Sequence, residues 1–368
     1  MWPYWFLFSI SAIILLSRVS SIQPQNSKLS IEWLMFFILL VGMIGLRHEV
    51  GGDWRNDWQV VTGSRVKGAS VSLEDALRVG DIGYILLVLL VNDLGFDVYT
   101  LDVLSALPFA GGLIAFCRSQ PRSWLAMVIA IPYLVIVVAM GYTRQSVAIG
   151  FVMLGLVALT RGSSFRFVLW LALAATFHKS AVVLLPLGVL GVTRHRVLII
   201  FWVIVSTLLL FLLLLRESVD ALFLNYVVAE YNSQGARIRV VMNALPALLF
   251  LLLRRRFILL KNEKTFWTWM SWGGILFVGL LAISPSSTAV DRMALYWIPL
   301  QLFVFSRLPD AIVKSGNHKV VWVYLIVAYS ALVQFVWLFF AQTAYAWLPY
   351  QFYPWVWLWP DLTPGKWD

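Results

Sequence analysis

Two aspartates in the stretch RHEVGGDWRNDW, residues 47–58, have the spacing of a carboxylate pair. If the chain continues as a helix after the two glycines, Asp53 and Asp57 share a face, because residues four apart are neighbours on a helix. Carboxylates placed in this way can orient an arginine such as Arg47, or take a proton from a substrate hydroxyl. The stretch by itself is equally consistent with a solvated loop that holds Arg–Asp pairs and tryptophan anchors.

Arginines and one histidine stand at the ends of other apolar segments. Arg144 begins the helix expected after GYTRQ, where a cation opposes the helix dipole unless an anion lies there too. Arg239 and Arg292 stand at two further helix starts, and His178 ends an apolar helix at the same expected depth. Arginine binds phosphate or carboxylate with two parallel hydrogen bonds, so the pattern predicts an anionic ligand. Taken singly, each arginine could also snorkel to lipid headgroups, and His178 could be a hydrogen-bonded structural residue.

Several kinds of site are not expected. The chain has no Walker loop, zinc-ligand spacing, GxSxG elbow or dinucleotide fingerprint. Its four histidines and single cysteine leave little for a metal centre and nothing for an internal disulfide. The net charge of +10 comes from basic residues scattered in short loops between apolar runs, which indicates membrane topology and not nucleic-acid binding. We therefore expect no cofactor, no metal and no nucleic-acid partner.

The elements that must position these residues are transmembrane helices. The 368 residues are 61% hydrophobic and 12% charged, whereas soluble domains average about 45–50% apolar and about 25% charged residues. Apolar runs of about 17–25 residues recur along the chain. The sequence predicts an all-α polytopic protein with one integral membrane domain, 1–368, in which the first apolar segment is retained as a helix. We expect about twelve spans, at residues 2–17, 30–46, 99–117, 124–141, 145–160, 165–177, 180–193, 197–215, 241–258, 266–283, 293–306 and 320–340.

The distribution of arginines sets the topology. A hairpin break at FHKS, residues 177–180, keeps the arginines of the short loops on the cytoplasmic side, as the positive-inside rule prefers. One bent helix or a re-entrant pair over 165–193 remains an alternative. Both termini and the long loops 47–98 and 216–240 then lie outside, where we expect the chemistry. The run 82–91 is too short to cross and predicts an interfacial or re-entrant helix in the first of these loops.

These segments, in this order, resemble the EpsG family of exopolysaccharide polymerases, a Wzy-like group. RHEVGGDW resembles its Arg-x-x-Val-Gly-x-Asp-aromatic pattern, and GYTRQSVAIGF resembles its Arg-Gln helix start. FHKSAVVLLPL resembles its Phe-His-x-Ser-Ala segment, DRMALYWIPL its late Arg-x-x-x-Tyr pattern, and LPYQF its Pro-Tyr tail. The resemblance covers nearly the whole chain. In two departures, Gly52 stands where threonine is expected, and Trp54 and Trp58 stand where tyrosine is usual.

The resemblance implies a GT-C-like membrane glycosyltransferase of the bacterial cytoplasmic membrane, with its active site facing outwards. Its substrates would be oligosaccharide repeats on undecaprenyl diphosphate, and its usual partners are membrane lipid and a chain-length regulator. By this resemblance Arg144 and Arg292, with Arg47, bind the pyrophosphate. Asp53 is a base or orients an arginine, and His178 hydrogen-bonds the acceptor sugar or assists proton transfer. The expected catalytic residues are Asp53, Arg144 and His178, and the expected substrate-binding residues are Arg47, Arg144, Gln145, Arg239, Arg292 and Tyr296.

Two other classes of protein remain open at this point. A flippase for lipid-linked oligosaccharides would also need arginines near a pyrophosphate, but the chain shows no clear internal repeat and the candidate residues gather at one face. A membrane acyltransferase that modifies polysaccharide would need a histidine paired with Asp or Glu at the cytoplasmic side. His178 is expected on the other side.

Overall fold

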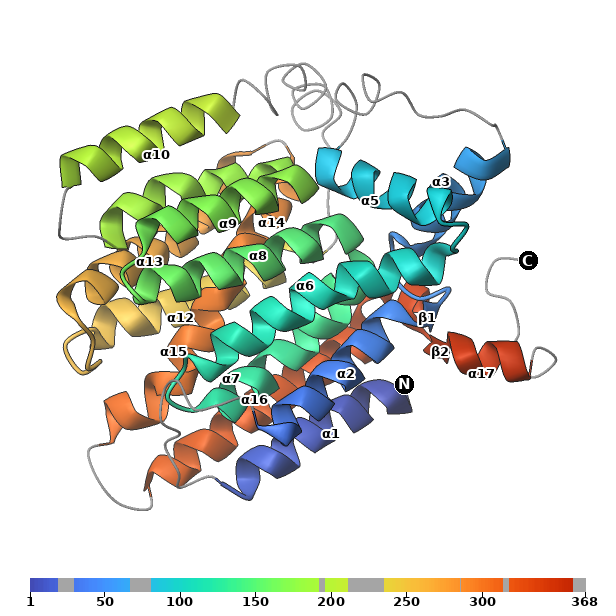
Figure 1. The fold of residues 1–368 in the computed structure, drawn as a ribbon. Helices are drawn as coiled ribbons and strands as arrows, with labels where there is room; N and C mark the ends of the chain where they lie inside the picture. Colours follow the sequence, from blue (N-terminus) through green and yellow to red (C-terminus); the bar gives the residue numbers. More distant parts are fainter. Residues whose placement is uncertain are drawn as a thin grey trace.

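A computed structural model of the chain describes residues 1–18, 30–66, 81–191, 196–210, 235–284, 286–313 and 318–359, which form a bundle of helices (Figure 1). The only strands in these ranges are the two-residue β1 (Arg47–His48) and β2 (Gln351–Phe352). The first half of the chain contributes α1 (Trp2–Leu16), α2 (Ile31–Gly45), α3 (Trp54–Val66), α5 (Ile82–Asp93), α6 (Val98–Arg118), α7 (Ser123–Ala130), the π-helix η1 (Ile131–Ala139), α8 (Thr143–Thr160) and α9 (Ser164–Phe177). The second half contributes the 3₁₀ helix η2 (Lys179–Gly191), α10 (Arg196–Leu210), α12 (Ala236–Leu253), α13 (Lys261–Ile283), α14 (Ser287–Ala294), η6 (Leu295–Trp297), α15 (Ile298–Ile312), α16 (His318–Phe340), η7 (Gln342–Trp347) and α17 (Tyr353–Leu358).

The prediction of an all-α membrane protein is confirmed for the described residues. Over the described residues each expected span overlaps one of these helices or a run of consecutive ones, and 82–91 lies within the short helix α5. The ends of the spans expected at 180–193 and 197–215 lie outside the described residues. Among the described helices, five are long and apolar enough to cross a membrane, namely α6, α8, α12, α13 and α16. The other apolar helices are shorter, so the count of about twelve spans and the GT-C-like architecture stay predictions.

One boundary was predicted wrongly. The span expected at 241–258 begins at Ala236, directly after Gly235 with its left-handed φ of +78°, and ends at Leu253. Residues 236–240, expected in an external loop, are therefore helical, because the chain enters α12 directly from the left-handed Gly235. The rest of the expected loop, from 216 to 234, lies outside the described residues.

The chain turns back on itself at His178, as the arginine distribution predicted. His178 caps α9 in an extended conformation, with φ −156° and ψ 109°. Beyond it η2 packs along α9: a Cβ placed on Gly188 would lie 2.7 Å from Phe167 Cε1. Residues on either side of the turn therefore touch, which is the contact of a hairpin and not of one bent helix.

Small residues bring α6 and α8 into backbone contact. A Cβ on Gly112 would lie 2.0 Å from the Gly150 carbonyl oxygen, and a Cβ on Gly150 would lie 2.5 Å from the Pro108 carbonyl oxygen. Glycines at a helix crossing allow this approach, which is common between membrane helices. The two helices run in the same direction, so their first turns lie at the same end of the bundle, where β1, β2 and α3 also lie (Figure 1).

The C-terminal segment seals this end. The strands pair antiparallel, Arg47 with Phe352 and His48 with Gln351. The indole N–H of Trp347 donates to the Ile136 carbonyl (2.8 Å), and the Tyr4 hydroxyl donates to the Trp347 carbonyl (2.6 Å). The tail around LPYQF thus holds the start of the stretch 47–58 in place through this strand pairing.

A second set of charges lies at the other end of the helices. The ion pairs there are Arg18–Glu32 (2.5 Å), Arg122–Asp310 (2.8 Å), Lys319–Asp310 (3.0 Å) and Arg307–Glu263 (3.5 Å). Charged side chains therefore separate to the two ends of an apolar bundle, as expected of a polytopic protein. Which end faces the cytoplasm stays a prediction from the positive-inside rule.

Candidate active site

Asp53 is placed by a tight turn against the start of α8. Gly51 has φ +100°, and a Cβ there would lie 1.8 Å from the Met140 carbonyl oxygen, so only glycine fits. After this turn the Asp53 amide donates to the Gly141 carbonyl (3.1 Å), and its carboxylate accepts from the Thr143 amide (3.2 Å). The free Thr143 amide at the start of α8 is thus occupied by the Asp53 carboxylate.

Asp57 lies in the first turn of α3, one helical turn after Asp53, as the four-residue spacing predicted. Its carboxylate accepts hydrogen bonds from the Thr143 hydroxyl (2.6 Å) and from the Tyr84 hydroxyl of α5. Burial, together with the charge of Asp53, raises the pKa of Asp57 to about 6. Burial also raises the pKa of Asp53, whereas the guanidiniums of Arg292 and Arg144 lower it. Asp53 is half-buried and Asp57 is 1% exposed, so Asp53 is the accessible member of the pair.

Arg47 is enclosed by the protein. Its side chain is 1% exposed and donates to the carbonyls of Val50 (3.0 Å) and Ile44 (2.5 Å). Its Nη2 atom donates to Asp102 (3.0 Å) and to the Thr143 hydroxyl (3.0 Å). These contacts tie α2, α6 and α8 together. Arg47 therefore contacts Thr143, which in turn contacts both aspartates, and its expected binding of pyrophosphate stays a prediction.

Arg144 is the accessible arginine on α8. Its side chain is 39% exposed, and its guanidinium reaches Asp81 at 3.5 Å, with the Tyr84 ring centroid 5.6 Å from Cζ. The other carboxylate oxygen of Asp81 accepts from the Lys179 amide at 3.2 Å. Asp81 thus connects Arg144 to the α9–η2 hairpin, which carries His178.

His178 lies at the tip of that hairpin with its ring held by two hydroxyls. Nδ1 lies 2.6 Å from Ser180 Oγ and 3.1 Å from Tyr296 Oη, so Nε2 lies on the opposite edge of the ring. Burial, reinforced by the charges of Arg292 and Arg144, lowers the pKa of His178 to about 3. The imidazole is therefore neutral at physiological pH and can donate or accept a hydrogen bond.

Arg292 packs on the other side of the α8 start. Its Cζ lies 4.1 Å from the centre of the Tyr142 ring, and Nη1 reaches Gln145 Oε1 at 3.5 Å. The Gln145 side-chain amide donates to the Arg292 carbonyl (2.6 Å). Gln145 is 1% exposed and Tyr296 is fully buried. Gln145 contacts Arg292 and Tyr296 contacts His178, and the expected binding of substrate by both stays a prediction.

Arg239 contributes to the site through an ion pair. Its Nε and Nη2 atoms contact the two carboxylate oxygens of Asp291 at 2.8 and 2.5 Å. Asp291 is 4% exposed and directly precedes Arg292. This paired contact links the start of α12 to α14, which carries Arg292. The expected binding of substrate by Arg239 stays a prediction.

The expected residues converge, although they come from distant parts of the chain. Asp53 contacts the Thr143 amide and Arg292 contacts Gln145, the residues on either side of Arg144. His178 contacts Tyr296, four residues after Arg292. Asp53, Arg144, His178 and Arg292 lie before α3, on α8, at the α9–η2 turn and on α14. Two accessible guanidiniums, a carboxylate and a neutral imidazole therefore face one region. Such a set can stabilise a negatively charged leaving group while it activates a hydroxyl.

The comparison with protein families gives a match. The model of the EpsG family matches residues 30–352. The chain belongs to the EpsG family. The matched region contains every residue of the site, and EpsG membership supports a role like that of a polysaccharide polymerase. Neither the comparison with curated proteins nor the comparison with solved structures gives a match.

Several residues of this EpsG site were not predicted. Thr143, Tyr84 and Asp81 contact the expected residues directly. Asp102 could have been found, because a carboxylate inside an apolar span usually has a charged partner. Within the described segments no three His, Cys, Asp or Glu side chains group in a way that could hold a metal ion.

Proposed function

We propose that this EpsG-family protein is a GT-C-like glycosyltransferase that polymerises a bacterial polysaccharide. It joins oligosaccharide repeats carried on undecaprenyl diphosphate, at the outer face of the cytoplasmic membrane. A chain-length regulator is its proposed partner. Family membership supports the polymerase class, and the residues of the site supply the chemistry.

One observation carries the proposal. Arg144 and Arg292, from different helices, meet Asp53 at the start of α8: Asp53 accepts from the Thr143 amide and Arg292 contacts Gln145, the residues on either side of Arg144. When the bond between a sugar and a lipid diphosphate breaks, negative charge develops on the diphosphate oxygen. Guanidiniums that are already oriented stabilise that charge, and the loss of one such donor costs on the order of 10²–10³ in kcat.

The remaining residues serve the acceptor. The acceptor hydroxyl oxygen forms a bond to the anomeric carbon of the growing chain, while the bond from that carbon to the diphosphate oxygen breaks. The diphosphate leaves with the electron pair, and the carboxylate of Asp53 takes the proton. A carboxyl whose pKa is raised by burial is a stronger base than an exposed one. Neutral His178, held by Ser180 and Tyr296, hydrogen-bonds the acceptor sugar.

Replacement of Arg144 by alanine tests this proposal. In cells whose own gene is deleted, the variant should reach the membrane in normal amount but make no polymer, and lipid-linked single repeats should accumulate on the outer face. Arg237→Ala is the matched control, because Arg237 is an exposed arginine of the same end of the bundle. Normal polymer from the Arg144 variant would refute the proposal. Single repeats retained on the inner face would instead indicate a transporter.

A further inference from the structure

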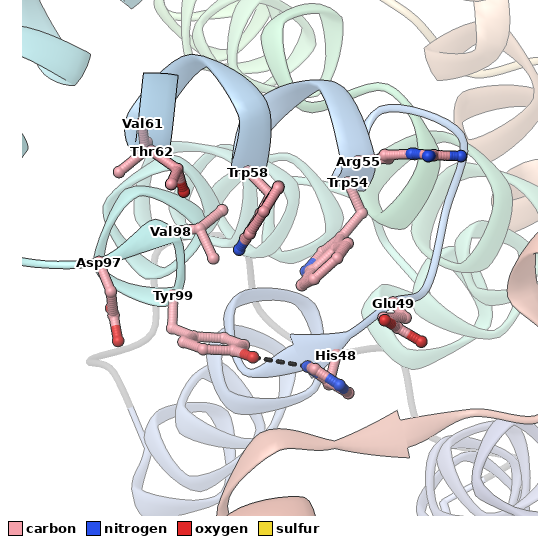
Figure 2. A pocket seen from close by; sticks show the side chains of 10 residues that line it. All are labelled: His48, Glu49, Trp54, Arg55, Trp58, Val61, Thr62, Asp97, Val98 and Tyr99. Atoms are coloured by element: carbon pink, nitrogen blue, oxygen red, sulfur yellow. Dashed lines mark hydrogen bonds between the residues drawn. The ribbon is translucent and has the colours of Figure 1, made fainter. Parts of the chain in front are cut away.

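A pocket of about 380 Å³ is lined in part by α3, the helix that follows Asp53 and carries Asp57. Three aromatic side chains line it, Trp54 and Trp58 from α3 and Tyr99 from α6, together with the carboxylates of Glu49 and Asp97 (Figure 2). The volume falls within the range of about 300–1,000 Å³ that is usual for small-molecule sites. Aromatic walls with a few polar groups are also typical of such sites.

The pocket and the candidate active site share helix α3. Trp54, Trp58 and Thr62 recur at four-residue spacing and therefore line one face. Asp53 and Asp57 each precede one of these tryptophans by one residue. The carboxylates therefore lie on the adjacent face, where they contact Thr143. A ligand in the pocket would lie next to the reacting groups.

The pocket contains a buried donor that lacks a partner. Trp54 is 5% exposed, and its indole nitrogen has no hydrogen-bond partner among the described residues. Figure 2 shows the Trp54 indole extending from α3 towards His48, with its nitrogen on the side of Trp58. Buried polar groups are rarely left unpaired in folded proteins. An acceptor oxygen of a ligand would satisfy this one.

The opposite wall is held in a fixed conformation. Tyr99 Oη lies 2.5 Å from His48 Nδ1, and the Tyr99 ring stacks on Tyr353 with centroids 3.5 Å apart. Glu49, which lines the pocket, has a left-handed φ of +50° although it is not a glycine. Such strain persists where the surrounding structure enforces it, and it is concentrated at binding sites.

We propose that this pocket binds sugar residues of a glycan, as a subsite of the transfer reaction; this inference rests on the proposed function. One face of a pyranose ring presents C–H groups with slight positive charge, which pack against the negative face of an indole. The 46% exposed Trp58 offers such a face. Sugar hydroxyls donate to Glu49 and Asp97, and a sugar oxygen accepts from Trp54 Nε1.

The charges favour a sugar over a diphosphate in this pocket. The carboxylates of Glu49 and Asp97 would repel an anionic headgroup, and the single arginine of the lining, Arg55, only partly offsets them. The adjacent arginines Arg144 and Arg292 suit the diphosphate instead. The two halves of one lipid-linked substrate thus have separate sites: sugar on the aromatic side of α3 and diphosphate on the arginine side.

Binding of free oligosaccharide tests the subsite without any transfer reaction. The probe is a set of oligosaccharides released by partial acid hydrolysis from the polysaccharide that the producing cells secrete. Saturation-transfer NMR on the full chain in lipid nanodiscs should detect them. Trp58→Leu should weaken the Kd at least about fivefold, and Trp58→Phe, which keeps an aromatic face, should weaken it less. Trp357→Leu is the matched control, because Trp357 is a 71% exposed tryptophan of α17 and should leave the Kd unchanged.

The outcomes separate this inference from the proposed function. An unchanged Kd in folded Trp58→Leu protein, or no saturation transfer to the oligosaccharides from the wild type, would overturn the subsite. If instead the oligosaccharides bind at the tryptophans while Arg144→Ala still makes polymer, the subsite stands and the arginine mechanism fails.

Discussion

Two arginines of the site, Arg47 and Arg144, should fail in different ways when they are replaced by methionine. Arg47 is 1% exposed and pairs with Asp102, which is fully buried. Arg47→Met leaves that carboxylate buried without its cation, which costs about 3–5 kcal/mol. Arg144 is 39% exposed and makes one ion pair at 3.5 Å, and an exposed pair of this kind is worth about 0–1 kcal/mol.

The two losses are easily distinguished against the whole stability of a protein, about 5–15 kcal/mol. The assay is the fraction of protein that stays monodisperse in detergent after heating, measured by size exclusion, with polymer production in cells as the second reading. Arg47→Met should yield little folded protein. Arg144→Met should fold like the wild type and make no polymer.

A double variant tests the physical reason. Adding Asp102→Asn to Arg47→Met removes the unpaired charge and should recover part of the lost stability, because the cost arises from the buried carboxylate. The reasoning would be refuted if Arg47→Met matched the wild type in stability while it lost polymer production. Arg47 would then act on substrate directly, as its place in the family pattern first implied.

Three further outcomes are expected. The pKa of Asp57 is raised to about 6, so the contribution of this carboxyl to folding stability is full below pH about 4 and is lost as the pH rises through 6. In thermal unfolding, the wild type should therefore exceed Asp57→Asn in stability by about 1 kcal/mol more at pH 5 than at pH 8, and an equal difference at both pH values would contradict the burial. The pKa of His178 is lowered to about 3, so its contribution to folding stability has the opposite pH dependence and is lost as the pH falls below 6.5. The stability of the wild type relative to His178→Gln should fall by about 2 kcal/mol from pH 8 to pH 5, and a rise over this range would refute the burial of a neutral imidazole. Gly51→Ala should abolish folding, because its Cβ would lie 1.8 Å from the Met140 carbonyl oxygen, whereas Gly52→Ala should be tolerated, because the nearest atom to its Cβ would lie 3.5 Å away. Equal yields of folded protein from the two variants would contradict the close packing at Gly51.

The helices were predictable because apolar length and the position of charges determine them directly. The hairpin at His178 is the clearest case, since the arginine distribution alone distinguished it from a single helix. The β1–β2 pair could not be predicted. Two-residue strands have no periodicity, and Arg47 pairs with Phe352, far away in the sequence.

The membership of the site was easier to predict than the roles of its residues. Arg144, His178 and Arg292 stand at segment ends, which the sequence shows. Arg47 has the same position but a different environment, because the packing of α2 against α6 buries it next to Asp102. The burial of Gln145 likewise depends on where α14 lies. Such facts follow from tertiary contacts, which spacing along the chain does not encode.

The central claim is that Arg144 and Arg292 hold the diphosphate of the lipid carrier together. A cryo-electron microscopy structure of the full chain in nanodiscs with undecaprenyl diphosphate tests it most directly. The claim predicts phosphate density within hydrogen-bonding distance of both guanidiniums, on the Asp53 and His178 side of α8. Phosphate bound at any other part of the surface, with both arginines still in their present contacts, would contradict it.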